Sequence, residues 1–502
     1  MARETETKYE AGADTVLPQL DGLPGVSEIR GPDLQQLDAE YYDTADLRLL
    51  RAGITLRRRK GGHDAGWHLK LPAGHGSREE IRLPLGRTGR RVPAEFAGLV
   101  TARTRGEPLT PVASIKTLRQ TTTLLDAEGE ALAEVADDHV HALAAAGLHN
   151  EQDQWREVEV ELLGGDRDLL EAADKLLRRA GLRRSSRSAK LERILRHPAS
   201  SRPAILRARP TAGEVVALYL REHADTLLAS DPLVRRREPD AVHKMRVATR
   251  RLRSALRSFG PVVGPAEGSE VAGELKWLGS VLGAERDAEV QARRFQEHVG
   301  ETEVDVLLGP VQARIQAHLA TASATSHAAV VAALNSERYG ALLDALEALI
   351  DGPLAGPLAA RRASAIVPAA VRRSYRKTRR RVRIAAGLPL GPGRDAALHA
   401  ARKAAKQARY AAEAAIPVTG KPASQFAAQM RKIQSVLGDL QDTVVGRQVA
   451  RQLGVTAHLA GESAFTYGLF YSREACRAAQ LDSKATKTWA RASRRRHRRW
   501  LD

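Results

Sequence analysis

The feature that most restricts the fold of this chain is a pattern of histidine and basic residues that occurs twice in its C-terminal part. In each copy, basic residues follow a histidine by 3, 7 and 10 positions, and a Ser-Val-Leu-Gly segment begins 37 positions after the first histidine and 36 after the second. Agreement of this kind indicates a duplicated structural unit. The copies are His243, Arg246, Arg250, Arg253, 280–283 and Asp287, and His399, Arg402, Lys406, Arg409, 435–438 and Asp442.

These spacings predict one positively charged stripe on a helix in each copy. On an α-helix, offsets of 0, 3, 7 and 10 fall within an arc of about 80°. A solvated helix face usually mixes charges of both signs, whereas these stripes are almost purely basic. We expect them to face each other and to line a groove that binds an anion. The first stripe is His243, Arg246, Arg250 and Arg253, and the second stripe is His399, Arg402, Lys406 and Arg409.

The chain divides into two parts that differ in composition and in the period of their hydrophobic pattern. Its 502 residues are too many for one hydrophobic core. The first part alternates with period two and is interrupted by glycine-rich turns, which predicts a mostly antiparallel β domain with a helix near 167–180. Ala, Leu, Arg and Glu with a helical period dominate the second part. We expect a β domain at 1–196, a linker at 197–210, a helical domain at 211–485 and a basic tail at 486–502. The predicted strands are 3–10, 36–43, 53–60, 66–71, 78–83, 117–126, 131–140 and 154–163.

Several predicted strands place charged side chains on one face. Residues at i and i+2 share a face of a strand, so the carboxylates of Glu157, Glu159 and Glu161 project together, opposite Val158 and Val160. In a closed barrel with a polar lumen and helices outside, such faces would form one site. Carboxylates bind Mg²⁺ or Mn²⁺, and basic side chains bind phosphate oxygens. This mixture predicts a metal-dependent phosphoryl-transfer site.

The β domain resembles the CYTH family, also called the triphosphate tunnel metalloenzymes. The opening Glu-Thr-Glu-Thr-Lys at 4–8, Tyr-Tyr-Asp-Thr at 41–44, Leu-Arg-Arg-Arg at 56–59, 67–72, 157–161 and 188–190 carry this resemblance over about residues 1–195. It implies an eight-stranded antiparallel barrel that encloses a triphosphate.

The same resemblance assigns roles to individual residues. It implies that Glu4, Glu6, Glu159 and Glu161 bind the metal and, with Lys8, carry catalysis. It implies phosphate binding by Lys8, Arg57, Arg59, Lys70, Arg119 and Lys190. Weaker candidates are Glu80, Glu134 and Glu157. A cyclase or a thiamine triphosphatase would share this motif.

The helical domain resembles the CHAD family, the conserved histidine α-helical domain. The resemblance rests on both stripes together with the Leu-Gly and Asp elements that follow them, and covers about 211–480. It implies two four-helix bundles related by a pseudo-two-fold axis, with a basic central groove that binds inorganic polyphosphate. In the second copy, Gln441 stands where the first has Arg286.

The distribution of charge agrees with a polyanionic partner. The net charge is +19; residues 1–210 carry 33 Lys+Arg against 32 Asp+Glu, and residues 211–502 carry 46 against 28. Nucleic acid, an acidic membrane surface and polyphosphate all fit such an excess. Aromatic residues are only 4% of the chain, so platforms for stacking bases are scarce. No zinc-finger or RRM-like spacing argues for a specific nucleic-acid partner.

Three functions are compatible with these patterns. The leading hypothesis is a cytoplasmic polyphosphate-binding protein with a metal-dependent triphosphatase tunnel. The second is a non-catalytic scaffold associated with polyphosphate granules, and the third is a nucleic-acid-binding protein. The single cysteine, Cys476, excludes a disulfide framework. No apolar run is long enough for a membrane span, and the charged N-terminus does not fit a signal peptide. No pattern indicates an oligomeric state.

Two further basic runs lie outside the stripes. Residues 372–383 predict a helix whose Arg372, Arg376, Arg379 and Arg383 extend the groove. Residues 491–500 are expected to form a disordered, solvated arm that adds affinity for polyanions without specificity.

Overall fold

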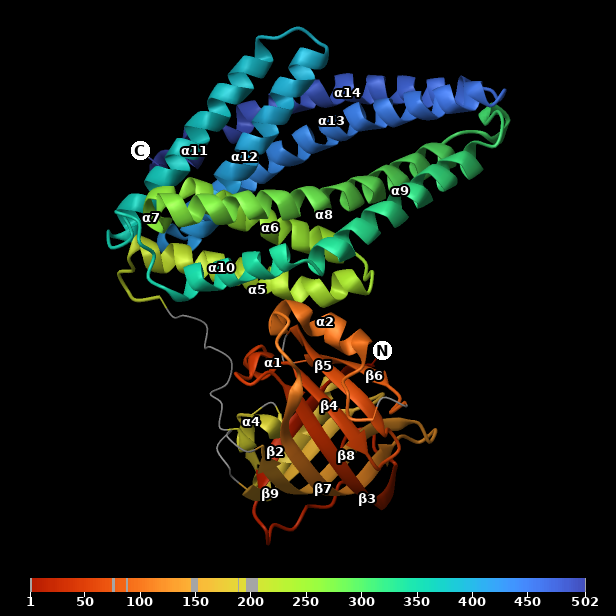
Figure 1. Ribbon diagram of the computed structural model, residues 1–502, viewed down its shortest axis with the longest axis vertical. Coiled ribbons are helices and arrows are strands. Elements are labelled where there is room, and N and C mark those ends of the chain that lie inside the picture. The colour runs from red at the N-terminus through yellow and green to blue at the C-terminus, as the bar shows by residue number, and fades with distance from the viewer. Residues whose placement is uncertain are drawn as a thin grey trace. The chain divides into compact units, whose positions relative to one another are not determined.

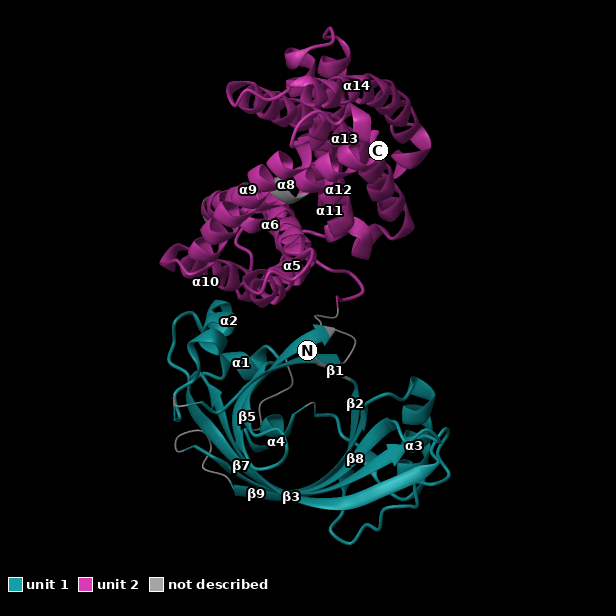
Figure 2. Cartoon of the chain, turned by 90° about the vertical axis from the view of Figure 1, so that its right-hand side faces the viewer, with its two compact units in different colours: residues 1–204 teal, residues 205–502 magenta. Residues whose placement is uncertain are grey.

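The computed structural model describes residues 2–74, 77–86, 89–145, 152–187, 189–195 and 206–501, with the side chains of 2–4, 74, 265–267, 288, 289 and 322 left out. The chain forms two compact units, residues 1–204 and 205–502 (Figure 2).

The first unit is a curled antiparallel sheet (Figure 2). Its strand order is β1-β6-β5-β4-β3-β7-β8-β9-β2-β10. Each of the eight predicted strands overlaps an observed one. The strands are β1 (Ala2–Glu4), β2 (Glu6–Ala11), β3 (Glu28–Asp43), β4 (Thr55–Lys60), β5 (Gly66–Gly74), β6 (Ser77–Leu83), β7 (Thr110–Leu125), β8 (Ala131–Ala144), β9 (Gln152–Leu162) and β10 (Arg183–Arg184).

The sheet of the described residues has ten strands, whereas the prediction was eight. The first predicted strand is interrupted at Thr5, and its two pieces pair at opposite ends of the sheet. β1 pairs with β6, with Ala2 opposite Glu80, and β2 pairs with β9, with Glu6 opposite Glu161. The two-residue strand β10 then adds to β2. The N-terminal segment therefore connects both ends of the curled sheet.

Helices cover both faces of this sheet. On the outer face, α3 (Arg167–Arg179) packs Leu169 and Leu177 against Val158 and Val160 of β9. This helix confirms the prediction near 167–180, and the side chain of Asp166 caps its N-terminus by accepting from the amide of Leu169 at 3.0 Å. α2 (Ala94–Thr104) covers β4 and β5 in the same way. α1 is a single turn (Arg48–Arg51).

The short helix α4 (Lys190–Ile194) packs against the opposite, inner face (Figure 2). Leu191 and Ile194 are buried against Ile115, Val140 and Trp155, which point to the inside of the curl. The expectation of a wholly polar lumen is therefore wrong at this end, because apolar residues of three strands and of α4 fill it. The charged side chains occupy the remainder of the inner face.

The second unit is all helical (Figure 1). Its first helix, α5, begins with a capping box between Thr211 and Glu214. Among the described residues, no helix has the length and apolar character needed to cross a membrane. The α-helices are α5 (Ala212–Arg235), α6 (Ala241–Ser258), α7 (Gly260–Val263), α8 (Pro265–Gly300), α9 (Val311–Leu334), α10 (Glu337–Asp351), α11 (Ala363–Ala386), α12 (Pro392–Thr419), α13 (Lys421–Leu459) and α14 (Phe465–Ala492).

The order of helix packing repeats within this unit. In the first half α5 packs on α6, α6 on α8 and α8 on α9; in the second half α11 packs on α12, α12 on α13 and α13 on α14. The halves meet where α6 contacts α12. A second link is the buried carboxylate of Glu474 on α14, which pairs with Arg294 and, at 2.5 Å, with His298 on α8.

The basic tail differs from its prediction as a disordered arm. α14 continues to Ala492, and two 3₁₀ turns follow, η2 (Arg495–His497) and η3 (Arg499–Leu501). Leu501 is buried, and the ring of Trp500 packs edge-on against Phe426 at 6.0 Å. These two apolar residues at the end of the run hold the preceding arginines against the helices.

Candidate functional site

Carboxylates line one side of the inner face of the curled sheet, on β8, β9 and β2. Moving away from α4, the rows of directly opposed residues contain first Asp138 and Glu157, then Glu159 and Lys8. The last row places Glu161 directly opposite Glu6 on one side and Glu134 on the other. Side chains directly opposite each other lie on the same face of the sheet. The inner face therefore ends in three adjacent glutamates.

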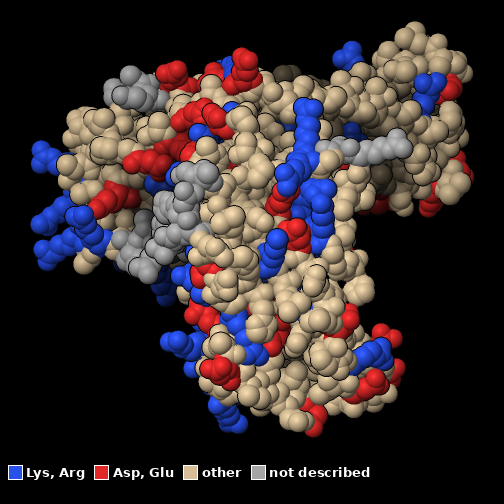
Figure 3. Space-filling view, turned by 60° about the horizontal axis from the view of Figure 1, so that its bottom comes forward, with Lys and Arg blue, Asp and Glu red and all other residues tan. Residues whose placement is uncertain are grey.

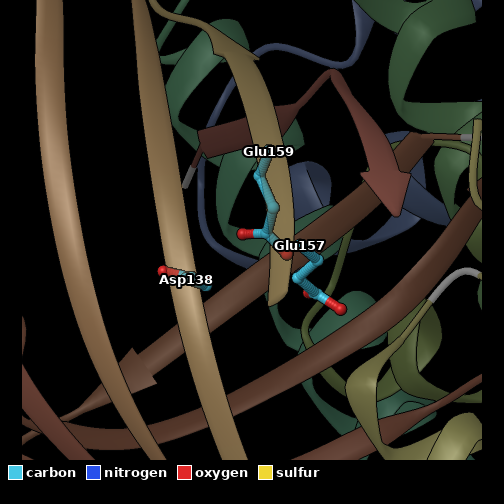
Figure 4. Close-up of side chains that lie close together, drawn as sticks. All are labelled: Asp138, Glu157 and Glu159. Carbon is cyan, nitrogen blue, oxygen red and sulfur yellow. The ribbon is translucent and has the colours of Figure 1, made fainter. Parts of the chain in front are cut away.

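The three carboxylates nearest α4 lie together (Figure 4). Oxygens of Asp138, Glu157 and Glu159 are all within 4.8 Å of one another, and the two glutamates project from β9 while the aspartate projects from β8. Lys190, the first residue of α4, brings its ammonium group between them. Its Nζ lies 2.9 Å from Asp138, 2.5 Å from Glu157 and 2.7 Å from Glu159.

Arg119 and Lys8 complete this network. The guanidinium of Arg119 donates two hydrogen bonds of 2.7 Å to Asp138 and one of 2.8 Å to Glu159. The ammonium of Lys8 pairs with Glu159 and lies 3.3 Å from Glu6. Burial acts to raise the pKa of Glu159, but the charges of Lys190, Lys8 and Arg119 outweigh it and hold that pKa well below its usual value. Glu159 is therefore ionised at neutral pH.

Basic side chains line β4 and β5 on the same inner face. Burial acts to lower the pKa of Arg59, the charges of Arg57 and Arg119 act in the same direction, and the pKa falls to about 9. Arg57 faces the hydroxyl of Tyr41 at 3.4 Å. Lys70 lies 3.7 Å from Glu80, whose other oxygen pairs with Arg82. Positive charge thus exceeds negative charge on this wall, so an anion bound beside it is stabilised.

His68 has a structural role in this wall. Its Nδ1 lies 2.9 Å from Glu80 and its Nε2 lies 2.8 Å from the carbonyl oxygen of Asp64. Burial lowers the pKa of His68 to about 4 despite the hydrogen bond to Glu80. The ring thus bridges the backbone of Asp64 and Glu80 and positions the carboxylate.

In the second unit, the two stripes lie on the two helices that connect its halves. α6 carries the first stripe and α12 carries the second. Arg251 of α6 pairs with Glu413 of α12 at 3.1 Å, and Glu413 also lies 3.3 Å from Arg409 of the second stripe. The aromatic ring of Tyr410 faces the guanidinium groups of Arg251 and Arg409. These interactions fix α6 against α12.

Charges from both stripes act on one lysine. Burial lowers the pKa of Lys406 to about 6, and the charges of Arg402, Arg250, Arg246 and Arg409 act in the same direction. Arg246 and Arg250 belong to α6, so both helices bring basic groups to this position. The same causes, burial and neighbouring arginines, lower the pKa of Arg250. The positive charges at this site repel one another, so a bound anion would stabilise them.

The Ser-Val-Leu-Gly segments meet the stripes in both copies. A Cβ added at Gly283 would lie 3.4 Å from a terminal guanidinium nitrogen of Arg246, and one at Gly438 would lie 2.9 Å from that of Arg402. The glycines thus make room for a stripe arginine in both copies. The aspartate after the glycine holds Arg246 in the first copy, where Asp287 accepts at 3.0 Å.

Comparisons with known proteins identify both units. The CYTH domain family matches residues 2–194, and the CHAD domain family matches residues 218–451. An uncharacterized protein of Mycobacterium tuberculosis is 38% identical over 484 residues, which cover 94% of this chain and 93% of that protein. The chain belongs to the CYTH–CHAD family.

Solved structures match each domain separately. The CHAD domain of the plant Ricinus communis is 25% identical and covers 59% of this chain and 97% of that one, with a TM-score of 0.46. A Hippeastrum protein whose structure revealed a dominant triphosphatase activity is 16% identical and covers 39% of this chain and 95% of that one, with a TM-score of 0.24. The CYTH domain places the chain among the triphosphate tunnel metalloenzymes, which are typically metal-dependent.

The CYTH domain brings most of its predicted site residues to one inner face. Glu6, Lys8, Glu159 and Lys190 are linked by the ion pairs described above, and Arg119 joins them. The predicted metal ligand Glu4 falls outside the described side chains. Asp138 was not predicted. It lies four residues after Glu134 on the same face of its strand, and directly opposite Glu157, so the period-two pattern of β8 contained the signal.

The CHAD domain places its predicted residues less uniformly. Six of the eight stripe residues lie close enough to influence each other's charge. The charges of Arg246, Arg250, Arg402 and Arg409 act on the pKa of Lys406, and those of Arg402 and Lys406 act on the pKa of His399. His243 lies near Arg286, and His399 is hydrogen bonded to Gln441. Gln441 is the residue of the second copy that stands at the position of Arg286 in the first, so each of them lies beside the histidine of its own stripe. At the end of the first stripe, Arg253 has a different neighbour, Arg257.

The basic run at 372–383 lies in α11, as predicted for a helix, and α11 contacts both α6 and α12.

On the face drawn in Figure 3, basic and acidic side chains are mixed over most of the surface, with basic ones gathered in a narrow band near the centre of the view.

The CYTH domain offers carboxylate ligands for a divalent metal in two places, the cluster of Asp138, Glu157 and Glu159 and the row of Glu6, Glu161 and Glu134. Like charges directly opposite on neighbouring strands destabilise a sheet unless a cation lies between them. The cluster of Asp138, Glu157 and Glu159 also offers carboxylates, but Lys190 and Arg119 already balance its charge. Among the described residues, only that cluster has three carboxylates with oxygens within 4.8 Å of one another, so the side chains of the Glu6–Glu161–Glu134 row would have to rearrange to hold Mg²⁺ or Mn²⁺, which prefer a few carboxylates and leave positions for water and phosphate.

Proposed function

We propose that the CYTH domain hydrolyses inorganic triphosphate or a related triphosphate with Mg²⁺ or Mn²⁺, and that the CHAD domain binds inorganic polyphosphate. The proposal takes the curled sheet as a closed tunnel and the two halves of the helical unit as four-helix bundles related by a pseudo-two-fold axis. The carrying observation is the inner face of the sheet, where a row of three glutamates lies on the same face as a basic wall.

In this proposal the chain's own residues bind and orient the triphosphate. Arg57 and Arg59 donate hydrogen bonds to phosphate oxygens from one wall, and Lys8, Arg119 and Lys190 do so from the other, which neutralises charge as the phosphoanhydride bond breaks. α4 closes the inner end by apolar packing and so excludes water there. The metal, held by Glu4, Glu6, Glu159 and Glu161 together with Glu134, would supply Lewis-acid activation of a phosphoryl oxygen.

The first test of this function is phosphate release by the full-length protein. Inorganic triphosphate, ATP, thiamine triphosphate and long polyphosphate are each incubated with Mg²⁺, Mn²⁺ or EDTA. We expect release from at least one triphosphate with one metal and none with EDTA, because the glutamates alone would repel the substrate. If no triphosphate releases phosphate with either metal, the chain is a binding protein that organises polyphosphate, for example at cytoplasmic granules.

The second test concerns the pH dependence of polyphosphate binding. Lys406 has a pKa of about 6 in the free protein, and a bound anion raises this pKa. Binding therefore takes up a proton above pH 6, so affinity is highest below the free pKa and falls as pH rises towards the bound pKa.

We expect affinity for long polyphosphate to fall by up to about tenfold per pH unit above pH 6, together with proton uptake measured by calorimetry in buffers of different ionisation enthalpy. Lys406→Arg keeps its charge and should flatten the profile. An unchanged profile in Lys406→Arg would contradict the assignment.

A further inference from the structure

The helical unit contains a basic pocket that neither stripe lines. A pocket of about 470 Å³ lies between α13, α14 and the turn η2. This volume falls in the range of about 300–1,000 Å³ typical of sites for small ligands. Its lining residues are Gln429, Lys432, Ser435, Val436, Lys484, Thr488, Arg491, Arg494, Arg496 and His497.

The lining of this pocket is basic and holds no carboxylate. Five of the lining residues are Lys or Arg, and His497 is a sixth basic group. Lys432, Lys484 and Arg491 form no ion pair with any carboxylate among the described residues, and the same holds for the two lining arginines of the tail. Because like charges repel, such a gathering is costly unless an anion compensates it.

Helix geometry and apolar anchors hold these basic groups in place. On α14, Lys484, Thr488 and Arg491 recur at i, i+4 and i+7 and so share one face. The tail follows directly after α14, and the burial of Leu501 and the packing of Trp500 against Phe426 hold it against the helices. The pocket is therefore built by folded elements.

The pocket is separate from the stripes. On α13, Gly438 contacts the guanidinium of Arg402 in the second stripe. Around the axis of α13, Gln429, Lys432 and Val436 lie about 120–180° from Gly438 and Ser435 lies about 60° from it, because each residue advances about 100°. The pocket thus opens on the α14 side of α13, and the stripe lies on the α12 side.

We propose that this pocket binds clustered phosphate groups, either a segment of a polyphosphate chain or a small polyphosphorylated molecule. Arginine donates paired hydrogen bonds to phosphate, lysine contributes a compact charge, and Ser435 and Thr488 add neutral donors. Burial lowers the pKa of His497, and the charges of Arg496, Arg494 and Lys432 act in the same direction. A bound phosphate cluster would reverse that effect and so add a further cationic donor.

Lysine acylation of the full-length protein, read by mass spectrometry, tests the site locally. The probes are inositol hexakisphosphate and long inorganic polyphosphate, both in EDTA so that the tunnel is inactive. Lys432 and Lys484 are expected to be protected at least tenfold, whereas Lys421, exposed at the start of α13, is not. Protection by the hexakisphosphate at equal phosphate concentration assigns a small ligand, and protection by the long chain alone assigns a chain segment.

A matched pair of variants decides whether the pocket itself binds. Lys432→Ala with Arg491→Ala removes two pocket charges, and Arg451→Ala with Arg477→Ala removes two exposed charges from the same two helices outside the pocket. We expect at least tenfold weaker binding of the protecting probe only in the pocket variant, with unchanged thermal unfolding in both.

Equal binding by both variants, or absence of protection by either probe, would overturn the site. Arg250→Ala with Lys406→Ala should leave protection of Lys432 and Lys484 unchanged, so that failure of the stripes and failure of the pocket are distinguishable.

Discussion

Replacement of Glu6 by Gln is expected to lower metal-dependent phosphate release from triphosphate by about 10²–10³-fold, the usual cost of removing one preorganised charge-stabilising group. Glu6 lies directly opposite Glu161, which lies opposite Glu134 on its other side. Glutamine preserves the size of the side chain and removes its charge. The stability of the metal-free protein should change little, because relief of the repulsion from Glu161 opposes loss of the 3.3 Å ion pair between Glu6 and Lys8, and Lys8 retains its ion pair with Glu159.

Two measurements separate this effect from simple misfolding. Saturating Mg²⁺ or Mn²⁺ should raise the unfolding temperature of the wild type and not that of Glu6→Gln, because only a metal bound to the folded state stabilises it. Glu28→Gln is the control, since among the described residues its exposed carboxylate pairs only with Arg30, at 3.4 Å, and such surface pairs contribute about 0–1 kcal/mol. Full activity in Glu6→Gln would move the metal to another set of carboxylates.

Glu159 is a poorer choice for the same experiment. Its carboxylate contacts Lys8, Lys190 and Arg119, all in the interior of the curl. Removing one partner from a buried ion network costs about 3–5 kcal/mol, because the remaining charges lose their compensation. A loss of activity in Glu159→Gln would therefore combine loss of fold with loss of chemistry.

The strands and stripes could be predicted from the sequence because each signal is local. Alternation along β9 separates Glu157, Glu159 and Glu161 from Val158 and Val160, and burial of both valines follows that pattern. The spacing within each stripe depends only on the helical period. The split of the first strand at Thr5 could not be predicted in this way, because it depends on which distant strands each piece pairs with.

The position of α4 and the folding of the tail also could not be predicted from the sequence. Leu191 and Ile194 show that α4 has an apolar side, but only tertiary packing decides that this side contacts Val140 and Trp155 on the inner face of the sheet. In the tail, arginines outnumber apolar residues, so composition favoured a solvated arm. The burial of Leu501 and the packing of Trp500 against Phe426 outweigh that tendency.

The duplicated stripes yield the largest expected effect on polyphosphate binding. Arg250→Glu and Lys406→Glu, made separately, should each weaken binding of long polyphosphate by at least tenfold at low salt, although they lie on different helices. The reason is that, in our proposal, one polyphosphate molecule would contact both stripes, because charges of Arg246 and Arg250 on α6 and of Arg402 on α12 all act on Lys406. Lys244→Glu, an exposed reversal on α6 one residue past His243, should change affinity little.

Salt and chain length make this prediction specific. Binding of each phosphate group releases counterions, so the slope of log affinity against log salt should become shallower by about 0.7 for each phosphate that a variant no longer binds. A nucleic-acid protein would show a similar slope, so competition decides: long polyphosphate should displace an oligonucleotide at equal phosphate concentration, and the oligonucleotide should not displace polyphosphate. A chain too short to span both stripes should respond to only one of the two reversals. Normal binding by both variants, or stronger competition by the oligonucleotide, would show that the stripes do not form one polyphosphate site.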